Sequence, residues 1–219
     1  MSAATPNMID ISLLVRPDMP FWPNSEGYRI RRTREIAAGD TANVSLITSD
    51  VHVGTHVDAP LHFIEGGAAV EQLPLEVLIG PARVVYLPEV DAITAEVLNA
   101  LNLPADTRRL LFRTRNSRLW AEGVPTFRED YVALTLDGAQ WIVERGIALI
   151  GNDYLSVQRY RDTPEIHRVL LRAGVVLVEG LNLDGVAPGL YELICLPVKL
   201  LGAEGAPARA VLRPLPKEG

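Results

Sequence analysis

The spacing of apolar and polar residues predicts a regular succession of strands and helices from residue 82 onward. Short apolar runs of strand length occupy 82–90, 108–115, 147–153 and 175–183. Apolar residues recur at helical spacing in 92–103, 136–146 and 164–174. The last of these segments opens with Pro164 and closes with Gly174, an asymmetry typical of helices. Strands that alternate with helices predict an α/β fold with a central mixed sheet and flanking helices.

The part of the chain before residue 82 has a pattern typical of β structure. Residues 8–15 are predicted to form an opening strand, and 16–27, which hold three prolines, a loop. Residues 28–40 begin with apolar and charged residues in alternation, as in an exposed strand, and 42–54 continue with β-branched residues. We find neither an internal repeat nor a linker long enough to separate two domains. One domain over 1–219 is therefore expected.

Composition and charge narrow the classes of function. The net charge of −6 offers no basic surface for phosphate backbones, which argues against nucleic-acid binding. No stretch reaches the roughly 18 consecutive apolar residues of a membrane helix, and the N-terminal pattern is not that of a signal peptide. The single cysteine, Cys195, lies in an apolar run and is expected to pack in the core. These features predict a cytoplasmic protein without a nucleic-acid or membrane partner.

The segment VHVGTHVDAPLHF, residues 51–63, contains an unusual number of residues that can bind a metal ion or transfer a proton. Three of the four histidines fall within it, at His52, His56 and His62, together with Asp58. Polar residues or glycine and proline occupy the even positions, and the odd positions are apolar except for Thr55. An extended chain would turn the even side chains toward one cavity and bury the odd ones. A helix would also align His52 with His56, but β-branched residues, glycine and proline disfavour it.

Two imidazoles and a carboxylate on one face match the ligands of catalytic zinc, which keeps a further position open for water. In this interpretation Gly54 leaves space for an ion between His52 and His56. The alternative is a set of structural histidines held by ordinary hydrogen bonds. That alternative explains a cluster poorly, because neighbouring imidazoles repel one another when they are protonated.

A second group of ligands is available farther along the chain. His167 lies in the first turn of the helix predicted at 164–174, and Glu179 ends the next predicted strand. A carboxylate is costly to bury unless it is paired or bound to a cation, although a solvent-exposed strand end would explain Glu179 equally well. The return from helix to strand could bring both residues beside Asp58, which would then bridge two sites.

These residues resemble a known family. The motif H-x-G-T-H-x-D-x-P-x-H, residues 52–62, is similar to that of the cyclase-like metal-dependent hydrolases, which include bacterial kynurenine formamidases and isatin hydrolases. The later block HRVLLRAGVVLVEGLNL, 167–183, and the earlier segments GDTANVSLITSDVHVGTH, 39–56, and FWPN, 21–24, resemble other parts of that family. The resemblance extends from about Ile9 to the end of the chain.

The resemblance implies a swivelling β/β/α fold, assembled as homodimers or homotetramers, and specific roles for the residues of the motifs. His52, His56 and Asp58 would bind a first metal ion. Asp58, His167 and Glu179 would bind a second, and His62 would act as a general acid/base. The resemblance thus implies two ions per chain, and the nitrogen and carboxylate ligands suit zinc, with manganese as an alternative.

Two segments depart from the formamidase pattern. Ser156-Val157-Gln158 stands where formamidases tend to have Ser, Ile or Val, and Asp, and Trp22-Pro23-Asn24-Ser25 stands where Trp-Pro-Gly-Asp is frequent. Both lie on the substrate side in this family. They weaken the assignment to formamidases and leave the metal ligands untouched.

The expected reaction is hydrolysis of an amide C–N bond, with an aryl formamide such as N-formylkynurenine, from tryptophan catabolism, as the substrate. An isatin-type hydrolase of cyclic amides or a biosynthetic cyclase would use the same metal site. A metal-dependent binding protein without turnover is a further alternative, against which His62 counts. Phe21 and Trp22 are predicted either to stack on an aromatic substrate or to pack in the core. Asp153 would orient a ligand histidine or, as we favour, cap the following turn.

Overall fold

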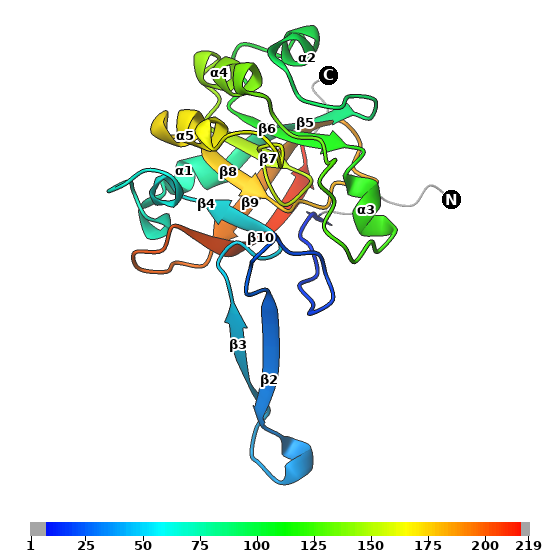
Figure 1. Cartoon of the computed structure of the whole chain (residues 1–219), viewed down its shortest axis with the longest axis vertical. Helices are drawn as coiled ribbons and strands as arrows, with labels where there is room; N and C mark the ends of the chain where they lie inside the picture. Colours follow the sequence, from blue (N-terminus) through cyan, green and yellow to red (C-terminus); the bar gives the residue numbers. More distant parts are fainter. Residues whose placement is uncertain (1–7, 216–219) are drawn as a thin grey trace.

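Four parallel strands form the centre of the fold (Figure 1). The computed structural model describes residues 8–215. The parallel strands stand side by side in chain order: β5 (Ile79–Leu87), β6 (Arg109–Thr114), β7 (Leu149–Asn152) and β8 (Val176–Glu179). The helices between them are α2 (Ala95–Ala100), α3 (Ser117–Ala121), α4 (Leu136–Glu144) and α5 (Glu165–Arg172). The predicted α/β fold is confirmed.

Antiparallel strands close this sheet into a ring. β8 pairs with β4 (His56–Asp58), β4 with β10 (Gly205–Pro214), β10 with β9 (Gly189–Pro197), and β9 with β5. Within residues 8–215 the ring has seven strands, and the short β1 (Ile9–Asp10) adds to the side of β10. The sheet is therefore mixed, as predicted.

Two apolar clusters hold the layers together. The first joins the strands of the ring and includes Val57, Val178 and Cys195, all fully buried. Burial raises the pKa of Cys195 to about 12, and the expectation of a buried packing residue is confirmed. The second lies between the parallel strands and the helices and includes Leu177 of β8 and Leu170 of α5, both fully buried. Because α5 and β8 are both anchored in apolar layers, the residues that they carry have fixed positions.

The short helical segments lie in the connections. These are the 3-10 helices η1 (Ile36–Ala38), η2 (Pro60–His62) and η3 (Val70–Gln72), and the α-helix α1 (Leu75–Leu78). The strand expected over 8–15 forms only at Ile9–Asp10. Beyond that point the pairing becomes irregular: Ser12 forms an isolated bridge with Leu181, and the backbone N–H of Leu13 donates to the hydroxyl of Thr55 (2.8 Å).

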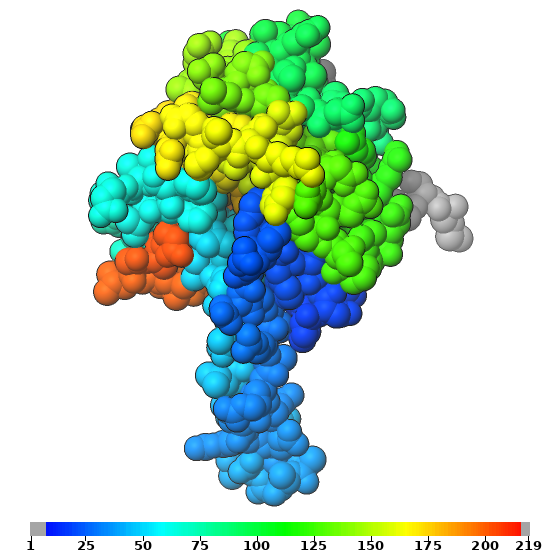
Figure 2. All heavy atoms as spheres, in the orientation of Figure 1, coloured from blue at the N-terminus to red at the C-terminus, as the bar shows by residue number. Residues whose placement is uncertain are grey.

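An antiparallel arm projects from the body of the protein (Figures 1 and 2). It consists of β2 (Tyr28–Arg34) and β3 (Val44–Ser49), which pair only with each other. Every residue from Arg29 to Thr48 is exposed, as the alternating pattern predicted for the first strand. The exposed side chains include large apolar ones: Ile30, Ile36, Val44, Leu46 and Ile47. This arrangement leaves both faces of the arm without a covering layer.

Among residues 8–215 we find no helix that is both long enough and apolar enough to cross a bilayer. The single domain over 1–219 and the cytoplasmic location stay predictions.

Candidate metal centre

The histidine-rich segment is less extended than its alternating pattern predicted. Only His56–Asp58 form a strand, β4, whereas 51–55 make a turn and Pro60–His62 form η2. The prediction of one extended run over 51–63 is therefore wrong outside β4. Two backbone features explain the difference: Gly54 has a positive φ of 68°, and Pro60 begins η2. His52 and His62 thus reach the site from turns on either side of β4.

Gly54 has a different role from the one predicted. A Cβ at this position would lie 2.6 Å from Cγ2 of Val15, so the space beside it is filled by protein. On its other side a Cβ at Gly180 would lie 2.2 Å from the carbonyl oxygen of Gly54. The two glycines allow the turn before β4 to pack directly on the end of β8. The close approach brings β4 and Glu179 together.

The pairing of β4 with β8 places three of the proposed ligands. His56 stands opposite Glu179 in the antiparallel register, and Asp58 lies two residues along the same strand. Nε2 of His56 is 3.4 Å from Oδ1 of Asp58 and 3.4 Å from Oε2 of Glu179. Nδ1 of His52 is 2.9 Å from Oδ1 of Asp58. The first predicted group, His52, His56 and Asp58, is therefore brought together.

Helix α5 brings the fourth histidine to the same place. Nε2 of His167 lies 3.2 Å from Oε1 of Glu179 and 3.9 Å from Oδ2 of Asp58. Potential ligand atoms lie within 4.8 Å of one another in each of two groups: His52, His56 and Asp58, and Asp58, His167 and Glu179. Asp58 belongs to both groups. The structure thus places together side chains that are more than a hundred residues apart in the sequence.

Unpaired polar atoms show that these residues fit a divalent cation. His56, Asp58, His167 and Glu179 are buried, and their exposed fractions do not exceed 4%. The described part of the chain offers no hydrogen-bond partner for Nε2 of His52, Nε2 of His56 or Oδ2 of Asp58. Buried polar atoms without partners are costly, and nitrogen and carboxylate oxygen are ligands that zinc and manganese accept.

Electrostatics keep the carboxylates of this cluster ionised. Burial by itself would raise the pKa of Asp58, but the hydrogen bond from His52 and the nearby imidazole of His56 hold it well below its usual range. Burial and the charge of Asp58 both work to raise the pKa of Glu179, yet the hydrogen bond from His167 and the nearby imidazole of His56 lower it. Burial works to lower the pKa of His56, whereas the nearby carboxylates of Asp58 and Glu179 raise it to about 10. A cation that binds here would therefore displace protons from histidine.

The orientation of the His56 ring is set by the backbone. Nδ1 of His56 is 2.9 Å from the carbonyl oxygen of Gly54, and this oxygen can only accept a hydrogen bond. Nδ1 therefore carries a hydrogen, and the other nitrogen, Nε2, faces the two carboxylates. This is the arrangement that metal-ligating histidines adopt.

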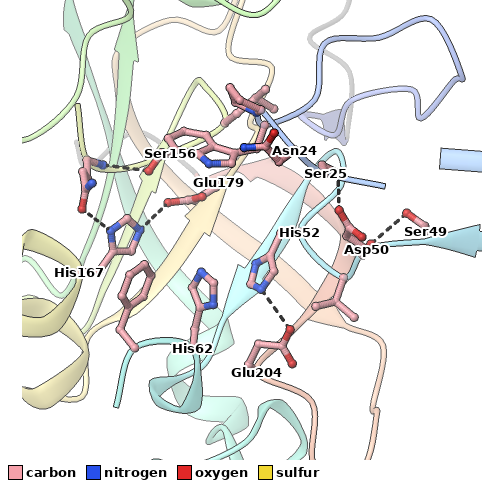
Figure 3. Close-up of a pocket in the computed structure, with 16 residues that line it drawn as sticks. Asn24, Ser25, Ser49, Asp50, His52, His62, Ser156, His167, Glu179 and Glu204 are labelled. Atoms are coloured by element: carbon pink, nitrogen blue, oxygen red, sulfur yellow. Dashed lines mark hydrogen bonds and ion pairs between the residues drawn. The ribbon is translucent and has the colours of Figure 1, made fainter. Parts of the chain in front are cut away.

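His62 lies at the edge of the cluster without joining either ligand group. Its ring stacks on that of His52, with 4.0 Å between centroids, and Figure 3 shows it between His52 and His167. Burial lowers the pKa of His62, which favours a neutral imidazole. A neutral ring in this position can accept a proton.

A pocket of about 580 Å³ opens onto the cluster, a size usual for sites that bind small molecules (Figure 3). Its wall includes Trp22, Asn24, Ser25, Asp50, Ser156 and Glu204, besides His52, His62, His167 and Glu179. Trp22 packs edge-on against Phe127 and Tyr160, with 5.3 and 5.5 Å between ring centroids. Phe21 does not line the pocket. Its ring packs against the backbone of Gly27, where a Cβ would lie 3.2 Å from the ring, so the structure favours the packing role over substrate stacking.

Two acidic residues differ from the sequence-based expectation. Asp153 is fully buried, and its carboxylate accepts hydrogen bonds from the backbone N–H groups of Thr114 (2.6 Å) and Ser117 (3.1 Å). It therefore braces the connection after β6, and the predicted cap of its own following turn is wrong. Glu204 was not predicted: its Oε1 lies 3.6 Å from Nε2 of His52. It occupies the loop between β9 and β10, where no motif marks it.

Comparison with known sequences identifies relatives of this chain. Residues 9–159 match a family model described as "Putative cyclase". Cyclase-like protein 1 of Arabidopsis thaliana is 43% identical over 212 residues, which cover 93% of this chain and 83% of that protein. A kynurenine formamidase of Geobacillus thermodenitrificans is 37% identical over 206 residues, 94% of this chain and 96% of the relative.

Solved structures show the same fold. A potential metal-dependent hydrolase with cyclase activity superposes with a TM-score of 0.81 at 33% identity, over 95% of this chain and 98% of the other. Isatin hydrolase A from Ralstonia solanacearum superposes with a TM-score of 0.80 at 24% identity, over 94% and 90% of the two chains. The second likeness, at its low identity, concerns the fold alone.

Proposed function

The chain belongs to the cyclase-like family of metal-dependent hydrolases, and we propose that it cleaves the C–N bond of an aryl formamide such as N-formylkynurenine. The observation that carries the proposal is the pair of ligand groups that share Asp58, next to a pocket lined by His52, His62, His167 and Glu179. The 37% identity to a protein named kynurenine formamidase supports this substrate. Relatives from plants carry only the name cyclase-like.

The residues of the site would have separate roles in hydrolysis. His52, His56 and Asp58 would hold one divalent ion, and Asp58, His167 and Glu179 a second, for which we propose zinc, with manganese as the alternative. Such ions lower the pKa of bound water from 15.7 towards about 7 and polarise a carbonyl group. His62 would take the proton of the attacking water and deliver it to the leaving nitrogen. Trp22 would stack on the aryl ring of the substrate.

A second candidate substrate is a cyclic amide such as isatin, because of the charges in the pocket. Among the described residues that line it there is no lysine or arginine, whereas Asp50 and Glu204 are acidic. The α-carboxylate of N-formylkynurenine therefore has no cationic side chain to pair with in the wall. Isatin is neutral and needs no such partner. Ring formation in a biosynthetic reaction would use the same ligands.

A side-by-side assay tests the proposal. The purified protein, reconstituted with zinc and separately with manganese, is given N-formylkynurenine and isatin, and the release of each product is followed by absorbance. We expect hydrolysis of both substrates to need the metal, with faster turnover of the formamide. Faster turnover of isatin would favour a cyclic amide as the substrate. Fully metallated protein that hydrolyses neither these compounds nor other amides or esters would favour a binding protein.

The arm supports a further part of the proposal, a homodimer. A two-stranded hairpin with no covering layer is marginally stable in water, and this one exposes Ile30 and Ile47 as a cross-strand pair. Residues 28–49 contain four arginines and two acidic residues, Glu35 and Asp40, so the arm is positively charged. The whole chain has a net charge of −6. The remainder of the chain is therefore acidic, and a second copy offers the arm a surface of complementary charge.

Light scattering during gel filtration measures the assembly. We expect the mass of the wild type to be twice the 24.0 kDa of one chain, and the double variant I30D/I47D to elute as a monomer. Leu201→Asp, a charge introduced at an exposed leucine outside the arm, is the control and should remain dimeric. A monomeric wild type, or a dimer that survives both arm substitutions, would contradict the proposal. Larger wild-type assemblies that the arm substitutions dissociate would point to the tetramer instead.

A further inference from the structure

The segment Ser156-Val157-Gln158, one of the two departures from the formamidase pattern, lies directly behind the second ligand group. Nδ1 of His167 is 2.9 Å from Oε1 of Gln158. His167 has an exposed fraction of 3% and Gln158 of 9%, so water has little access to this contact. An amide oxygen can only accept a hydrogen bond, and Nδ1 of His167 therefore carries a hydrogen. The other nitrogen, Nε2, then faces Glu179 and Asp58.

The neighbouring backbone fixes which way the Gln158 amide points. Nε2 of Gln158 lies 3.1 Å from the carbonyl oxygen of Asp162, which accepts hydrogen bonds and donates none. The NH₂ group must therefore face Asp162, and Oε1 must face His167. The main chain of Gln158 is also anchored, because the hydroxyl of Tyr131 donates to its carbonyl oxygen (2.5 Å). The acceptor for His167 is thus held from two sides.

The same segment also positions Glu179. The backbone N–H of Val157 donates to Oε1 of Glu179 (2.7 Å). The two ligands that belong only to the second group, His167 and Glu179, are therefore both held by residues 157–158. His56 of the first group is held instead by the carbonyl oxygen of Gly54. A side chain thus orients the histidine in the second group, and the backbone does so in the first.

We propose that Gln158 is a positioning residue that sets the affinity of the second ligand group for its ion. The inference rests on the two-ion site of the proposed function. Partners that hold the distal nitrogen of a ligating histidine fix its tautomer and ring orientation, and their loss typically weakens metal binding by about 10–100-fold. Because Gln158 touches only His167 among the ligands, its replacement acts on one ion and spares the other.

Zinc titration of the metal-free protein, followed by calorimetry, measures both affinities without any substrate. We expect the wild type to bind two ions. In Gln158→Met, which keeps the bulk of the side chain and removes the acceptor, the second ion should bind about 10–100-fold more weakly while the first is unchanged. Gln158→Glu keeps an acceptor oxygen and should restore the second ion. If Gln158→Met does not fold, Gln158→Ala takes its place with the same expectations.

A matched control separates positioning from general loss of stability. Oε1 of Gln72 accepts a hydrogen bond from the backbone N–H of Ala69 (2.8 Å), and Gln72 neither lines the pocket nor belongs to a ligand group. Gln72→Met should lower the melting temperature without altering either zinc affinity. Two ions bound by Gln158→Met as tightly as by the wild type would overturn the role of Gln158 alone. A wild type that binds one ion would overturn the two-ion site together with this inference.

Discussion

Asp58→Asn is expected to abolish hydrolysis, with a loss of at least about 10³-fold in kcat/KM, and to remove metal from both ligand groups. Asparagine has the shape of aspartate but lacks its charge, and the Asp58 carboxylate is the only described side chain that the two groups share. A metal ion contributes several kcal/mol to stabilising the transition state, and each 1.36 kcal/mol corresponds to a tenfold change in rate.

Metal content per chain and kcat/KM are measured on the same preparations, and circular dichroism confirms that the variant is folded. Glu179→Gln is the matched comparison, because Glu179 belongs to the second group alone. It should reduce the content from about two ions to about one, whereas Asp58→Asn reduces it below one. Asp58→Asn protein that retains two ions and wild-type activity would exclude the bridged site.

His62→Ala should lower kcat by about 10²–10⁴-fold, the usual contribution of a general acid/base, while the metal content stays at the wild-type value. His62 contributes no atom to either ligand group, yet it lines the pocket and stacks on His52. Its loss therefore removes a proton carrier and leaves the ligands in place. This separation of activity from metal content distinguishes catalysis from binding.

His62→Gln serves as the control for packing, because glutamine fills part of the space of the ring and cannot carry the proton. Both variants should lose turnover to a similar extent and retain their zinc. Turnover that recovers in His62→Gln would assign His62 a packing role, and a fall in metal content in both variants would make it a ligand.

The periodicity of the sequence predicts the parallel half of the fold well. The runs at 108–115 and 147–153 contain β6 and β7, and the helical spacing at 164–174 contains α5. These elements bury apolar faces in a regular layered packing, so local pattern and final structure agree. The closure of the ring is not predictable in this way, because β4 pairs with strands far away in the sequence.

The two ligand groups were expected from residue types and from the resemblance, but the contacts around them were not. The alternating pattern at 51–63 suggested one long strand, whereas Gly54 and Pro60 interrupt it. Glu204 and Gln158 meet the ligand histidines through loops, whose paths are not encoded in a local pattern. In the sequence Gln158 was notable only as a departure from the formamidase pattern. Its contact with His167 is visible only in the tertiary structure.

The closed ring has a consequence for synthesis on the ribosome. β4 leaves the exit tunnel early, yet both of its neighbours, β8 and β10, come from the last quarter of the chain. Folding that proceeds as the chain emerges can build the helical layer first, but the ring around β4 cannot close until residues 205–214 are available. Nascent chains must therefore remain without a closed ring around β4, the strand that carries His56 and Asp58, until residues 205–214 have left the ribosome.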